Sequence, residues 1–325
     1  MIAVAESLDY GVGLRLGPVI RRGVIAVLRR AYGDCLRTYD DGRAPPRDAP
    51  DMENRPAAST RTEPPRSSTP DSPPTAPTGR KPSPVERLCY VIGAALVVSG
   101  LLHLIVFAVD GGPWDGPVSW RKPVTFGLSF GLTLIAICWV ASYVRLRART
   151  RTVLLAVFAA DCVLEVAGIT LQAWRGVPSH FNMETPFNTA VSMSLAVGGG
   201  ALVVILTALA VASFVRRPEG PAGMALALRA GFAILVVGLL AGAAMIARGV
   251  YLTRTGHQLA GYASTASLKP LHGVSLHAIL VLPVLARVLA GTPWSVSTRR
   301  TLVRAAVGCY AVAVVGALIW AVVAY

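Results

Sequence analysis

Charged residues are scarce in this sequence. Asp, Glu, Lys and Arg make up 15% of its 325 residues, whereas soluble domains carry about 25%. Hydrophobic residues make up 54% of the chain and fall in long blocks separated by short polar segments. Because a helix needs about 20 mainly apolar residues to cross a bilayer, the shortage of charge indicates a protein whose main solvent is lipid.

Cysteine patterns and catalytic motifs are also missing. The five cysteines form no C-x-x-C pair, which excludes zinc-knuckle and disulfide-framework interpretations. Four of them lie in apolar segments, where we expect small buried residues. There is no P-loop, Rossmann fingerprint, H-E-x-x-H or G-x-S-x-G elbow in a usable setting, so no motif names a reaction.

Seven long apolar blocks occupy the chain after residue 86. They cover residues 88–109, 123–144, 152–173, 187–215, 224–247, 270–290 and 301–324. A backbone in lipid must satisfy its own hydrogen bonds as a helix or a closed barrel, and barrel strands need only about 10 residues. The blocks therefore predict an all-α fold, a polytopic transmembrane helix bundle of about seven spans over residues 86–325.

Residues 1–85 differ from the rest of the chain. Residues 40–85 hold 12 of the 23 prolines, and such a segment buries too little apolar surface to offset its ordering entropy. We expect a disordered, basic, Pro-rich cytoplasmic tail. A short amphipathic stretch over residues 19–30 is expected to form a marginal helix or to lie on a membrane surface. Met52 is an alternative start of a shorter protein.

The positive charge follows the membrane topology. The chain holds 31 Lys and Arg against 17 Asp and Glu, a net charge of +14. The basic residues gather in the tail and in the loops after the second, fourth and sixth apolar blocks, which is the positive-inside pattern. We therefore expect the N-terminus in the cytoplasm, the C-terminus outside, the lipid bilayer as a partner, and no nucleic acid.

Two acidic residues interrupt the third apolar block. Asp161 and Glu165 have i,i+4 spacing, which places both carboxylates on one face of a helix. Ionisable residues inside a bilayer are costly and usually functional. We predict that this pair carries catalysis or a proton relay.

Three histidines lie in other apolar blocks. His103, Glu165 and His277 are each about six or seven residues from the outer end of their helix, or about 10 Å below the outer boundary. His272 lies nearer that boundary. If the side chains face one another, they form a polar site that opens to the outside.

Four interpretations of these residues compete. His103 and His277 are candidate axial ligands of a b-type haem, and His103, His277 and Glu165 are candidate ligands of a divalent metal with an open position. Asp161 and Glu165 are candidate members of a transporter's proton relay. In the structural alternative each His hydrogen-bonds a neighbouring helix and the carboxylates pair with Arg, Ser or Thr. The candidate partners of haem propionates are Arg121, Lys122, Arg175, Arg248 and Lys269.

Glycine marks two further positions. Gly238 and Gly242 form a G-x-x-x-G step, which favours close helix packing. Residues 198–200 are three consecutive glycines in the fourth block, which favours tight helix packing, with a helix break at a binding site as the alternative.

The outer loops contain distinctive strings. They are Trp120-Arg-Lys-Pro123, the segment from Gln172 to Asn182 that includes His180, and His272-x4-His277. Basic residues outside run against the charge bias, so Arg121, Lys122 and Arg175 are expected to hold an anionic ligand or to pair with Asp110, Asp115 or Glu184. The strings resemble those of uncharacterised multi-pass bacterial membrane proteins over residues 86–325. This resemblance implies a membrane body in a bacterial cell (inner) membrane and no particular reaction.

The leading functional hypothesis from the sequence is an outward-facing His/carboxylate site that binds haem or a metal for redox chemistry. The alternatives are a proton-coupled transporter that uses Asp161 and Glu165, and a non-catalytic membrane subunit that binds a partner through its outer loops. Seven spans with short loops leave no separate catalytic domain, so any activity is expected within the bundle or on its outer loops.

Overall fold

The structure is a computed structural model that describes residues 81–324. The amphipathic stretch over residues 19–30, the proline-rich segment up to residue 80 and the alternative start at Met52 lie outside these residues. Within residues 81–324 every regular element is a helix.

Seven of the helices are long and apolar enough to cross a membrane. They are α3 (Pro84–Asp110), α4 (Arg121–Ala141), α5 (Ala148–Trp174), α6 (Pro186–Val215), α7 (Met224–Arg254), α9 (Lys269–Ala290) and α10 (Val296–Val323). The predicted all-helical membrane bundle is confirmed. The six-residue helix α8 (Gln258–Ala263) was not predicted, because an element of this length is too short to form an apolar block.

The first membrane helix begins earlier than the apolar pattern predicts. Helix α3 starts at Pro84, four residues before the expected start, so the expected boundary between residues 85 and 86 lies inside it. A capping box fixes this start: the Glu86 amide donates to Ser83 Oγ and the Ser83 amide donates to Glu86 Oε2. The S-x-x-E pattern is a helix-start signal that the proline-rich composition had concealed.

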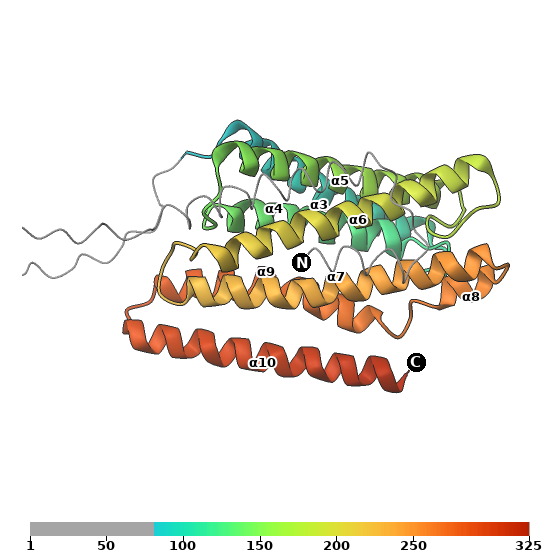
Figure 1. Ribbon diagram of the computed structural model, residues 1–325. Coiled ribbons are helices and arrows are strands. Elements are labelled where there is room, and N and C mark those ends of the chain that lie inside the picture. The colour runs from blue at the N-terminus through green and yellow to red at the C-terminus, as the bar shows by residue number, and fades with distance from the viewer. Residues whose placement is uncertain (1–80, 325) are drawn as a thin grey trace, which may run out of the picture. The chain divides into compact units, whose positions relative to one another are not determined.

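The long helices run side by side (Figure 1). Helix α3 packs mainly against α4 and α5, α6 lies between α5 and α7, and α9 lies between α7 and α10. Glycines permit the closest approaches, because a Cβ on Gly127 would lie 2.8 Å from the Gly100 Cα on α3. The predicted G-x-x-x-G step also packs closely, since Gly238 and Gly242 of α7 both contact His272 of α9.

Of the two interpretations of the glycines at residues 198–200, tight packing holds at Gly198 and the helix break was wrong. Helix α6 continues without a break through residues 198–200. The cysteine prediction holds for Cys89, Cys138 and Cys162, which are buried, but Cys309 on α10 is exposed. Nearly all of α10 is exposed because it packs on the rest of the bundle along one side only.

The two ends of the bundle differ in composition. We name the end that carries the connections 142–147, 216–223 and 291–295 the arginine end. The opposite end, with the connections 111–120, 175–185 and 255–268, is the histidine end, because all five histidines lie in the half nearer to it.

Candidate functional site

The two acidic residues of α5 face a glycine of α6. A Cβ on Gly198 would lie 2.7 Å from Asp161 Oδ1 and 2.8 Å from Glu165 Oε1, so only a glycine leaves both carboxylates this close to the α6 backbone. The side chains are buried, with Asp161 at 7% and Glu165 at 4% exposure. The structure therefore places both carboxylates on one helix face, in the seam between α5 and α6, as the i,i+4 spacing predicted.

This carboxylate pair has little to compensate its charge. Asp161 Oδ2 is buried without a hydrogen-bond partner. The ion pairs within residues 81–324 lie elsewhere, between Arg121 and Asp115 and between Arg145 and Glu219. The alternative in which Arg neutralises the carboxylates is therefore not what the described residues show.

His103 has a full set of partners instead. Its Nδ1–H donates to the Ser99 carbonyl over 2.7 Å, and its Nε2 accepts from the Trp174 indole N–H over 3.0 Å. Because a carbonyl only accepts, this geometry requires the neutral ring with its proton on Nδ1. The Trp120 ring lies beside it, with centroids 6.1 Å apart. Both nitrogens are used, so neither is free to bind a metal or a haem iron.

The two histidines of α9 also have local partners. His272 Nδ1 donates to the Gly238 carbonyl of α7 over 2.7 Å, which fits the structural alternative. His277 is exposed on the surface of α9, and its Nδ1 lies 2.5 Å from the Gly273 carbonyl of the same helix.

The expected convergence of His103, Glu165 and His277 does not occur. Within the described residues no three His, Cys, Asp or Glu side chains form a group that could hold a metal ion. Helices α3 and α9, which carry the two histidines, pack mainly against other helices. Residues at equal depth in three helices meet only if the helices are neighbours and are rotated toward one another. The helices that carry His103, Glu165 and His277 do not meet these two conditions.

The cations at the histidine end are held by groups of the protein. Arg121 pairs with Asp115, with Nε and Oδ1 3.0 Å apart, as the structural alternative predicted for outer basic residues. Lys122 Nζ donates to the Pro117 carbonyl over 2.5 Å. Arg175 donates to the Gln172 and Asn188 side-chain oxygens and lies over the Phe187 ring. The Arg175 contacts join α5 to α6, and all three cations have protein partners in place of a propionate.

The loop that follows α5 folds into the bundle. Ser192 Oγ on α6 contacts the carbonyls of Ser179 and Asn182 at 3.1 and 3.0 Å and accepts the Asn182 amide. Phe181 adopts a positive φ of 61° and packs against Gly249 of α7. The Asn182 side chain is fully buried and its Nδ2 has no hydrogen-bond partner. The string that forms this loop is distinctive in the sequence, whereas Ser192 is one of several Ser and Thr residues of α6 and gives no pattern.

His180 is the central side chain of this loop. It contacts Ser179 Oγ through Nδ1 over 2.9 Å and lies against Phe126 of α4. Burial, together with the positive charge of Lys122, lowers the pKa of His180 to about 4. The ring is therefore neutral at neutral pH.

Within residues 81–324 the geometry thus brings two buried acids together in the α5–α6 seam, and a hydrogen-bonded loop lies on the same two helices toward the histidine end. Comparison of the chain with protein-family models, with curated proteins and with solved structures gave no match.

Proposed function

We propose that this multi-pass membrane protein is a proton-coupled transporter and that Asp161 and Glu165 are its proton-binding groups. One observation carries the proposal: two buried carboxylates lie together against Gly198 without a compensating cation among the described residues. The proposal replaces the haem or metal hypothesis, because the described histidines do not form the ligand set which that hypothesis requires.

The physical argument starts from charge. A buried carboxylate that is ionised and unpaired is expensive, and two of them repel each other strongly where the dielectric constant is low. The pair therefore holds at least one proton when no cation is bound. Releasing and rebinding that proton changes the charge of the seam, which is how intramembrane carboxylates act in proton relays.

Further polar groups lie along the same two helices toward the histidine end. Ser192 is six residues from Gly198 on α6, or about 9 Å toward the histidine end. It joins the buried loop that contains Asn182 and the neutral His180 ring. Between these levels Leu195 of α6 packs against Gly168 of α5. We propose that protons pass along this seam and that Leu195 forms the apolar barrier.

The orientation of the protein is part of the proposal. The arginine end would lie in the cytoplasm, because Lys and Arg are retained on that side of bacterial cell membranes. The histidine end, with the buried loop, would then face outward, and protons would enter the seam from outside.

Purified protein in proteoliposomes provides the test. With a potassium gradient and valinomycin to set the membrane potential, an internal pH-sensitive dye reports proton entry. We expect faster entry with the wild type than in protein-free vesicles, and a decrease of at least about tenfold in Glu165→Gln. The matched control is Glu184→Gln, which removes an exposed carboxylate at the histidine end and should leave proton entry unchanged.

A second readout needs no transport substrate. Dicyclohexylcarbodiimide reacts with protonated carboxyl groups in lipid, so mass spectrometry should locate the adduct on Glu165 or Asp161 in preference to Glu184. Wild-type vesicles that acidify no faster than empty ones would reject transport even if the carbodiimide labels the pair. Unchanged proton entry in a well-folded Glu165→Gln protein would reject the role of the pair.

A further inference from the structure

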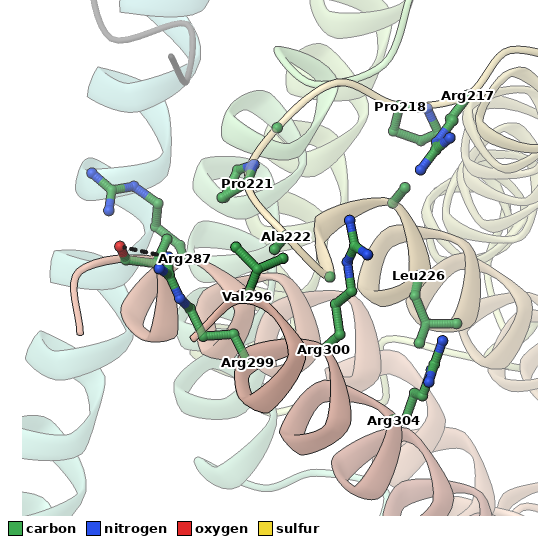
Figure 2. A pocket seen from close by; sticks show the side chains of 14 residues that line it. Arg217, Pro218, Pro221, Ala222, Leu226, Arg287, Val296, Arg299, Arg300 and Arg304 are labelled. Atoms are coloured by element: carbon green, nitrogen blue, oxygen red, sulfur yellow. Dashed lines mark hydrogen bonds between the residues drawn. The ribbon is translucent and has the colours of Figure 1, made fainter. Parts of the chain in front are cut away.

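A basic cavity lies at the arginine end, away from the carboxylate pair. It has a volume of about 830 Å³. The connection before α7, the first turns of α7 and α10 and the last turns of α9 form its walls (Figure 2). This volume is in the range of small-molecule binding pockets.

The charge of this arginine pocket is positive and unbalanced within the described residues. Five arginines line it, namely Arg217, Arg287, Arg299, Arg300 and Arg304. No Asp or Glu of residues 81–324 belongs to the lining. The nearest acid in sequence, Glu219 of the same connection, accepts a hydrogen bond from Arg145 Nε over 2.7 Å instead.

The arginines divide into those that are held and those that are available. Arg299 donates to the Trp294 and Ala290 carbonyls, which fixes its position. Figure 2 shows the Arg217 and Arg300 side chains entering the pocket from different walls, one from the connection before α7 and one from α10. Neither of these two forms an ion pair within residues 81–324, so their guanidinium groups are free to bind an anion.

Two helix N-termini add to the positive potential. Helix α7 begins beside Gly223, which provides no side-chain cap, and its first-turn residues Ala225 and Leu226 line the pocket. Helix α10 begins at Val296, which also lines the pocket, and its N-terminus is capped because Ser295 Oγ accepts the Thr298 amide. The exposed amides and the dipole of a helix N-terminus favour phosphate groups. Five arginines and the uncapped N-terminus of α7 thus make the potential around this space positive.

The surroundings favour a lipid over a free ion. Leu226 and Val296 in the walls are 38% and 47% exposed, and most residues of α10 beyond the pocket are exposed apolar side chains. A free phosphate ion gains nothing from apolar walls, whereas a phospholipid has a phosphate for the arginines and an acyl chain for the helix surface. We propose that the arginine pocket binds the phosphate of an anionic phospholipid headgroup, as basic pockets between membrane helices do.

Full-length protein in detergent tests this proposal directly. Native mass spectrometry with phosphatidylglycerol, and separately with phosphatidylcholine, measures binding of an anionic and a zwitterionic headgroup. We expect a preference of at least about fivefold for phosphatidylglycerol in the wild type, and a loss of most of that preference in Arg217→Gln and Arg300→Gln. The control is Arg149→Gln, which removes the same charge from an exposed position of α5 at the same end. Size-exclusion profiles and helical content verify that each variant folds.

Three outcomes would overturn the proposal. Equal binding of the two lipids would show that the arginines do not select an anion. An equal loss in Arg149→Gln would indicate general surface charge in place of a pocket. Competition by millimolar inorganic phosphate as effective as that by the lipid would assign the pocket to a free ion. None of these results depends on proton movement, so failure here leaves the role of Asp161 and Glu165 to its own test.

Discussion

Two ionisable residues are buried to a similar degree in neighbouring helices, yet their surroundings differ. His103 of α3 is 8% exposed and Glu165 of α5 is 4% exposed. The imidazole has a partner for each nitrogen, one from its own helix and one from the Trp174 indole. The carboxylate shares its site with a second acid, Asp161, one oxygen of which has no partner.

This difference separates structural from reactive polar groups. A buried polar group whose hydrogen bonds are complete stabilises the packing around it, and any change of protonation would break those bonds. A buried acid without a counter-charge is destabilising, so its retention requires another benefit. We therefore interpret His103 as a packing residue and the carboxylate pair as the functional one.

The largest expected effect comes from filling the space beside the pair. In Gly198→Ala the new methyl group would lie within 3 Å of both carboxylates, so one or both must move from the seam. We expect proton entry into proteoliposomes to fall by about tenfold. Gly200→Ala is the matched control, because a Cβ there meets nothing within 4 Å, and it should transport like the wild type. Equal activity of the two variants would remove Gly198 from the site.

A smaller effect, on stability and not on proton entry, is expected at His103, whose two ring nitrogens both have hydrogen-bond partners. His103→Leu removes the acceptor of the Trp174 indole and should lower the free energy of unfolding by about 1–2 kcal/mol, the cost of a lost hydrogen bond. Proton entry per folded molecule should stay the same. Denaturant unfolding and the vesicle assay measure the two quantities. Loss of transport without loss of stability would show that His103 is functional and would contradict the comparison.

The sequence predicted the fold well because bilayer thickness acts on composition directly. Each span needs a long apolar block, and such blocks are visible in a single sequence. The errors concern helix boundaries and short elements. Hydrogen bonds of Ser83 and Glu86 start α3 earlier than the apolar pattern predicts, and α8 has too few residues to show a pattern. The glycines at residues 198–200 left two interpretations open in the sequence, because glycine occurs both at helix breaks and at close packing inside a continuous helix.

The candidate site was predictable only within one helix. The i,i+4 spacing placed Asp161 and Glu165 together because both lie on α5, whereas His103, Glu165 and His277 belong to three helices. Depth from the membrane boundary gives the height of each residue, but neither the rotation of a helix nor the identity of its neighbour follows from it. The role of His103 depends on a contact with another helix, the hydrogen bond from the Trp174 indole, which a single sequence does not reveal.

The pH dependence of stability tests whether His180 is a third buried ionisable residue with a structural role. Its pKa is lowered to about 4 by burial and by Lys122, below the value of about 6.5 expected in the unfolded chain. The unfolded state therefore binds more protons between these values, so stability is full above about pH 6.5 and decreases as the pH falls toward 4. Melting temperatures from pH 7.5 to 4.5 should fall more steeply for the wild type than for His180→Asn, which removes this titration. Parallel curves would contradict the assignment.

The smallest effect is expected where an acid is exposed and paired, the reverse of the environment of Asp161. The Asp115 carboxylate is 81% exposed and lies 3.0 Å from Arg121 Nε. Exposed ion pairs contribute about 0–1 kcal/mol because water and salt screen them. Asp115→Asn should therefore change the melting temperature by no more than about 2 °C, with proton entry unchanged. A larger loss would mean that Arg121 requires this carboxylate to remain at the start of α4, and that charge compensation, not burial, decides which acids of this protein are structural.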